Sequence, residues 1–243
     1  MSLKKLRAWS VHFYTALGLV LAAGIAMLIV RGGGDSFRWA FSLMTIAVLI
    51  DATDGWLARR FKVKEVLPGF DGRKLDDIVD FQTYTSLPLL LIWRAGILPS
   101  GLGFCLLAPL IASAYGFCQV SAKTDDGYFL GFPSYWNILA FYLYCLQPPV
   151  WVSVGSILSC AFLTFVPSRY LYTTQPGRLN RFSNYLSILW AVILVWVFVN
   201  PSIGPLVGPR ARPLILLSLY YPAYYLAVSW AISLGFIPAQ QSY

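Results

Sequence analysis

The chain has 243 residues, of which 58% are hydrophobic and only 12% are charged, and its mean hydropathy is +0.66. Soluble domains carry roughly 25% charged residues, so this composition excludes an ordinary soluble globular protein. The net charge of +8 is typical of basic residues beside membrane helices and lipid head groups, and it does not indicate a nucleic-acid partner.

Apolar runs repeat along the whole chain at about the length of a membrane-spanning helix, which favours helices over a β-barrel. We therefore predict an all-α, polytopic integral membrane bundle that forms a single domain over residues 1–243. About eight transmembrane helices are expected, at residues 10–30, 38–58, 74–93, 98–120, 134–147, 150–167, 183–200 and 213–234. Only Gln147, Pro148 and Pro149 separate the fifth and sixth, so one broken helix is the alternative there.

The basic residues are distributed unevenly between the two sides of this predicted bundle. With eight spans and an inside start, 13 of the 18 Lys and Arg residues fall in the inner segments. Positive charge marks the cytoplasmic side of membrane proteins. Both termini and the loop after the second helix are therefore predicted to be cytoplasmic.

Residues 51–80 hold seven of the ten acidic residues, between two apolar runs. Placing one Asp well inside a spanning helix costs about 2.5–3.5 kcal/mol, so this cluster indicates chemistry rather than packing. Asp51 and Asp54 share one face at the end of the second helix, and Asp76 and Asp80 form one stripe at the start of the third. Asp71 is expected to cap that third helix.

The two acidic faces can meet, because a loop of about a dozen residues joins their helices. Four carboxylates that converge need cations, and hard divalent ions prefer oxygen ligands. The pattern predicts a site for Mn²⁺ or Mg²⁺, with two ions able to clamp a pyrophosphate.

Small and basic residues accompany these carboxylates. Gly55, Ala58 and Gly72 leave room for a ligand close to the backbone, and the planar guanidinium of Arg59 suits phosphate oxygens. The alternative for each is structural, because small residues let helices pack closely and Arg59 could serve as a positive-inside anchor. The only histidine, His12, is interpreted as an interfacial residue.

The stretch resembles the signature of the CDP-alcohol phosphotransferase family, D-x-x-D-G-x-x-A-R followed by a spacer and G-x-x-x-D-x-x-x-D. Every fixed position is present, at Asp51, Asp54, Gly55, Ala58, Arg59, Gly72, Asp76 and Asp80. Most members have eight residues between the Arg and the Gly, whereas residues 60–71 make twelve. The longer spacer, residues 124–142, residues 165–174 and the eight-helix topology resemble the phosphatidylcholine synthase branch of bacteria.

This resemblance implies transfer of a phosphatidyl group from CDP-diacylglycerol to choline in the bacterial inner membrane, with release of CMP and a possible homodimer. It implies that Asp51, Asp54, Asp76 and Asp80 bind the metal ions and that Asp80 is the base. Asp54, Gly55, Ala58, Arg59 and Gly72 would line the nucleotide site. Asp77 is a competing base, although it points about 100° away from the stripe. Another acceptor alcohol (serine, inositol or glycerol phosphate) is the main alternative, and a cation transporter is a remote one.

Binding of choline calls for aromatic faces, because its quaternary ammonium has no N–H donors. We select Tyr128, Trp136, Asn137 and Asp125 as candidates. The tyrosines at 220, 221, 224 and 225 are an equal alternative, and a purely structural aromatic belt is another. Arg169, Arg178 and Arg181 are assigned to the phosphates of CDP-diacylglycerol, the alternative being positive-inside anchors.

Overall fold

The computed structural model describes residues 2–122, 124, 127–172 and 177–237, and most of this chain is helical. The long helices α1 (Leu3–Arg31) and α2 (Gly34–Arg60) are followed by the short α3 (Val63–Val66). The remaining helical segments are α4 (Gly72–Asp80) with the π-helix η1 (Phe81–Ser86) and α5 (Leu87–Arg94), the 3₁₀ helix η2 (Ser100–Leu106) with α6 (Leu107–Cys118), α7 (Trp136–Leu146), α8 (Val150–Leu163), α9 (Arg178–Val199), the 3₁₀ helix η3 (Pro201–Ile203), and α10 (Arg212–Ser218) with α11 (Tyr220–Ser233).

Each predicted span coincides with one of these helical segments, which confirms the all-α membrane bundle. Five helices of the described chain are long and apolar enough to cross a membrane, at residues 3–31, 34–60, 100–118, 179–199 and 212–233. The apolar helices α7 and α8 are shorter. They are separate helices, because Gln147 adopts a left-handed conformation (φ 46°) before Pro148 and Pro149. The alternative of one broken helix is therefore wrong.

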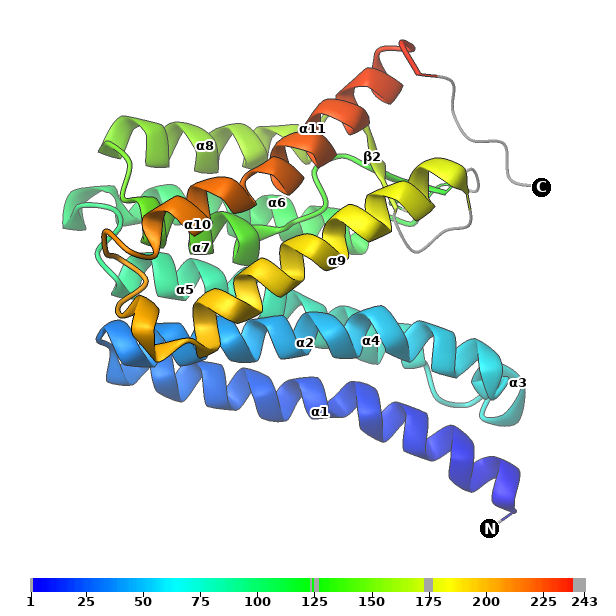
Figure 1. Cartoon of the computed structure of the whole chain (residues 1–243). Coiled ribbons are helices and arrows are strands. Elements are labelled where there is room, and N and C mark those ends of the chain that lie inside the picture. Colours follow the sequence, from blue (N-terminus) through cyan, green and yellow to red (C-terminus); the bar gives the residue numbers. More distant parts are fainter. Residues whose placement is uncertain (1, 123, 125–126, 173–176, 238–243) are drawn as a thin grey trace.

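The helices run back and forth between two ends of the molecule (Figure 1). α1 begins and α11 ends at the same end, where α3 lies with the two-stranded antiparallel sheet of β1 (Tyr128–Leu130) and β2 (Arg169–Leu171). The turn between α1 and α2 and the turn between α7 and α8 lie at the opposite end. Among the described residues, the start of α1, α3 and the two strands, which belong to segments predicted to be rich in Lys and Arg, thus lie at one end of the bundle.

A close approach between α1 and α4 sets the geometry of that end. A Cβ atom on Gly18 would lie 2.3 Å from Cγ1 of Val79, so only glycine allows this contact. Small residues let helix backbones approach closely in membrane proteins. The face of α1 that includes His12, Thr15 and Gly18 is consequently buried against the helices that carry the acidic residues.

Arg38, near the start of α2, holds the end of α9 to α2. Its guanidinium donates to the carbonyl oxygens of Phe198 (2.7 Å), Gly204 (2.7 Å) and Asn200 (3.2 Å), and also to that of Val197. The last carbonyls of a helix have no partner within the helix, and a cation there also complements the helix dipole.

Substitution Arg38→Met should therefore destabilise the protein by about 3 kcal/mol, because several charge-assisted hydrogen bonds are lost together. The measurement is the thermal unfolding midpoint in detergent. Arg31→Met, at an exposed position on the same end, is the control. Equal midpoints for the two variants would show that Arg38 does not hold these elements together.

Candidate active site

The two acidic faces meet where α2 passes α4. One carboxylate oxygen from each of Asp51, Asp76 and Asp80 lies within 4.8 Å of the others, and all three side chains are partly exposed. We call these residues the triad. Asp71 caps α4 by accepting a hydrogen bond from the backbone N–H of Lys74 (3.0 Å), as predicted. α4 therefore begins at Gly72, and the four-residue spacing of Asp76 and Asp80 puts both carboxylates on one face of it.

Asp54 is not part of this group of three. Its side chain is only 6% exposed, and its Oδ2 accepts a hydrogen bond from the Thr15 hydroxyl (2.8 Å). Thr15 of α1 thus contributes to the acidic region, and the sequence analysis did not include it. The signal in the sequence was the hydroxyl of Thr15 within an otherwise apolar run. A role for Asp54 as a metal ligand remains a prediction.

Tyr84 is a second residue that the sequence reasoning missed. Its hydroxyl donates to Oδ2 of Asp51 (2.7 Å). Tyr84 belongs to η1, and its side chain is buried. A signal was available, because Tyr84 continues the four-residue spacing of Gly72, Asp76 and Asp80. The π-helix that carries it follows Asp80 directly, and such wide turns often occur at functional sites.

Gly72 lies against α1. A Cβ atom at this position would lie 2.6 Å from Cε1 of His12, so the glycine makes room for the imidazole. His12 is 6% exposed, and its ring centroid lies 4.4 Å from that of Phe70. At the contact between Gly72 and His12, the start of α4 therefore packs against α1 with no space for a side chain larger than glycine at position 72.

Gly55, Ala58 and Arg59 extend from the triad along α2 to its end. Gly55 and Ala58 are partly exposed and Arg59 is exposed. A shallow pocket of about 390 Å³ opens there, lined by Ala58, Arg59, Lys62, Val63, Lys64 and Glu65. Three of its six lining residues are basic, which suits a phosphate-bearing ligand.

A family model described as CDP-alcohol phosphatidyltransferase matches residues 12–167, which include the triad, Thr15 and the pocket. The chain belongs to this family. It is therefore a membrane-bound CDP-alcohol phosphatidyltransferase, and enzymes of this family use a divalent metal ion, for which the triad provides oxygen ligands.

Several curated relatives share the same name. The chain is 37% identical to the phosphatidylcholine synthase of Pseudomonas aeruginosa over 199 residues, covering 80% of this chain and 79% of the relative. It is 38% identical to that of Bradyrhizobium diazoefficiens, covering 78% and 70%. Identity to that of Borreliella burgdorferi is 30%, with 88% and 90% covered. All three are bacterial proteins.

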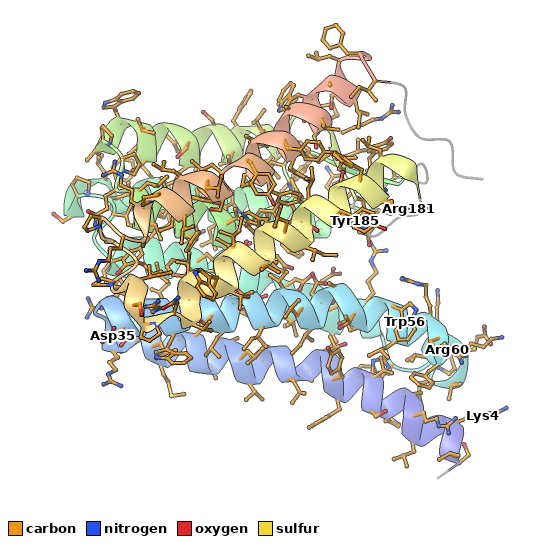
Figure 2. The ribbon with its side chains drawn as sticks, viewed as in Figure 1. Lys4, Asp35, Trp56, Arg60, Arg181 and Tyr185 are labelled. Atoms are coloured by element: carbon orange, nitrogen blue, oxygen red, sulfur yellow. The ribbon has the colours of Figure 1, made fainter. Side chains whose placement is uncertain are left out.

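Basic residues from three elements of this CDP-alcohol phosphatidyltransferase lie at the end that carries the triad. Lys4, Arg60 and Arg181 lie at this end, and Asp35 lies at the other (Figure 2). Arg181 is exposed on α9, and Arg169 is exposed on β2 with its guanidinium 5.9 Å from the ring centre of Tyr128. The side chain of Arg178 lies outside the described residues.

The residues selected for choline are more enclosed than expected. Tyr128 is 1% exposed and Trp136 is 0% exposed, and the Trp136 indole N–H donates to the Ser113 hydroxyl (2.6 Å). The buried Asn137 side chain accepts from the backbone N–H of Ile138 (2.8 Å). Asp125 lies outside the described residues. The described candidates therefore have structural partners, and their role towards choline stays a prediction.

Proposed function

We propose that this CDP-alcohol phosphatidyltransferase transfers the phosphatidyl group of CDP-diacylglycerol to choline, producing phosphatidylcholine and CMP. The observation that carries the proposal is the agreement of the relatives. Bacterial proteins that are 30–38% identical over most of the chain are phosphatidylcholine synthases. The triad supports it, because a cluster of carboxylates at one end of a membrane bundle suits chemistry on a pyrophosphate at the lipid surface.

The donor set fits Mg²⁺ or Mn²⁺, since both are hard ions that prefer carboxylate oxygens. Asp51, Asp76 and Asp80 would hold the metal, and we include Asp54 on the basis of the family signature, with two ions in all. When bound, the ions neutralise the charge of the pyrophosphate and of the CMP that leaves. Thr15 would act through Asp54, by fixing the orientation of its carboxylate.

Asp80 is proposed as the base. Its carboxylate takes the proton of the choline hydroxyl while the choline oxygen forms a bond to the lipid-side phosphorus. The bond from that phosphorus to the oxygen of CMP breaks in line, and the electron pair leaves with CMP. Because the nucleophile is a neutral alcohol, removal of its proton in the transition state lowers the barrier.

The nucleotide would lie along the end of α2. Gly55, Ala58 and Arg59 line its approach, and Gly72 keeps α1 close to α4. The pocket beside Arg59 supports this placement through its basic lining. Arg169, Arg178 and Arg181 would hold phosphate groups of the lipid or the pyrophosphate. We further propose that both termini and the site face the cytoplasm of the bacterial inner membrane, and that the protein is a homodimer.

The test uses purified protein, CDP-diacylglycerol and Mn²⁺ or Mg²⁺, with choline, serine and inositol offered separately. We expect CMP release and a lipid product with choline alone. Product with serine or inositol but not with choline would overturn the proposed acceptor and leave the enzyme family unchanged.

Substitution Thr15→Val tests the contribution of α1. Valine keeps the shape of threonine and removes the donor to Asp54, so we expect kcat/KM to fall about tenfold or more, as for other partners of metal ligands. The control is Thr45→Val on α2, because the Thr45 hydroxyl donates only within its own helix, to the carbonyl of Phe41. Equal rates for the two variants would show that the Thr15 hydroxyl does not support the site.

A further inference from the structure

Three tyrosines from three separate elements form a row that begins at the triad. Tyr84 in η1 donates its hydroxyl to Asp51 (2.7 Å). Its ring centre lies 6.3 Å from that of Tyr135, which precedes α7, and the ring of Tyr135 lies 5.7 Å from that of Tyr225 in α11. Both distances are typical of contacting aromatic pairs. We call these residues the tyrosine row.

The two outer rings of the row are buried and hydrogen-bonded, and the middle ring is partly exposed. Tyr84 is 8% exposed and is held by Asp51, and Tyr225 is 7% exposed and donates its hydroxyl to the carbonyl of Leu171 (3.0 Å). Tyr135 between them is partly exposed. Tyr135 is therefore the ring of the row that a ligand would contact, and its two neighbours are already positioned, which lowers the entropic cost of binding.

The row lies close enough to the triad for a molecule as small as choline to contact both. Only two carbons separate the hydroxyl oxygen of choline from its quaternary nitrogen, so a choline whose hydroxyl meets Asp80 keeps its cation close to the triad. A quaternary ammonium cannot donate hydrogen bonds and is bound by aromatic faces, assisted by negative charge. Tyr84 lies beside Asp51 and the ring of Tyr135 contacts that of Tyr84, whereas Tyr128 is 1% exposed and Trp136 is 0% exposed.

We propose that the tyrosine row is the acceptor subsite and that the partly exposed ring of Tyr135, flanked by Tyr84 and Tyr225, binds the trimethylammonium group of choline. This inference rests on the proposed function. It replaces the sequence-based choice of Tyr128 and Trp136 with residues next to the triad, and it uses one residue, Tyr225, from the tyrosine-rich last span.

The first test separates choline binding from binding of the lipid substrate. In Tyr135→Leu the KM for choline should rise about tenfold or more, and the KM for CDP-diacylglycerol should stay within about twofold. Tyr135→Phe keeps the ring and should stay near the wild-type KM for choline. The control is Tyr185→Leu, a 66% exposed tyrosine on α9 (Figure 2), which should change neither KM.

The second test asks whether the positive charge of choline is recognised. The alcohol 3,3-dimethylbutan-1-ol has the shape of choline without its charge. Wild-type protein should use choline far better than this alcohol, and Tyr135→Leu should lose most of that preference. A purely structural role of Tyr135 would reduce turnover of both alcohols equally.

A third test replaces Tyr135 by phenylalanine analogues with one, two and three ring fluorines. These analogues keep the ring shape but make the ring face less negative, so they should raise the KM for choline stepwise.

Failure of the acceptor subsite and failure of the proposed function give different results. If Tyr135→Leu and the fluorinated series keep the wild-type KM for choline and the wild-type preference, the tyrosine row is not the acceptor subsite. If wild-type protein makes no product with choline but does so with another alcohol, the proposed function fails instead. The fluorinated series decides the question even if Tyr135→Leu does not fold, because it leaves the packing of the ring unchanged.

Discussion

Asp80→Asn is expected to lower the rate of CMP release about 10²–10⁴-fold, the usual contribution of a general base. Asparagine keeps the shape of the side chain but cannot take the proton of the acceptor hydroxyl. Asp80 is also one of the triad, so some of the loss would come from weaker metal binding. Measuring the rate at saturating Mn²⁺ separates these two contributions.

The matched control for this variant is Asp77→Asn. Asp77 lies on the same turn of α4 and is partly exposed, but it is not among the three carboxylates within 4.8 Å of one another. We expect this variant to keep most of its activity. A wild-type rate from Asp80→Asn together with a large loss in Asp77→Asn would move the base to the neighbouring carboxylate.

Removal of divalent metal is the second change with a large expected effect. Chelation with EDTA should abolish CMP release, and Mn²⁺ or Mg²⁺ should restore it, because the charge of the pyrophosphate needs compensation. The variant Asp76→Asn loses one of three carboxylates, so the concentration of metal that gives half-maximal activity should rise by about tenfold or more.

The control for metal dependence is Asp71→Asn, which changes the cap of α4 and leaves the triad in place. Asparagine also caps helices well, so we expect the metal requirement of this variant to match the wild type. Full activity in EDTA, or an unchanged metal requirement in Asp76→Asn, would contradict a metal site at the triad.

Much of this protein can be predicted from the order of its residues. Hydrophobicity identifies the spans, because a bilayer accepts few structures other than apolar helices. Helical periodicity places Asp51 on one face and Asp76 and Asp80 on another, and the capping preference of Asp71 sets where α4 begins. These features depend on local chemistry and on the solvent, so no knowledge of neighbouring helices is needed.

Residues that act across helices could not be predicted in the same way. A periodic pattern shows which residues share a face, but it does not show which helix that face contacts. The bond from Thr15 to Asp54 and the contact of His12 with Gly72 both depend on α1 lying beside α2 and α4. The burial of Trp136 was missed for the same reason, because an aromatic residue near a span end suits both an interface and a core.

The sequence by itself determined the class of protein, the order of the helical segments along the chain, and the acidic residues that form the triad. Charged residues inside a membrane span cost so much free energy that an acidic cluster indicates function even when its contacts are unknown. Only the tertiary structure decided that three of four predicted carboxylates form one group and that a tyrosine row begins at Asp51. The triad arises where α2 meets α4, and the tyrosine row arises where η1, the start of α7 and α11 meet. Packing between segments that are distant in the chain leaves no periodic signal in a single sequence.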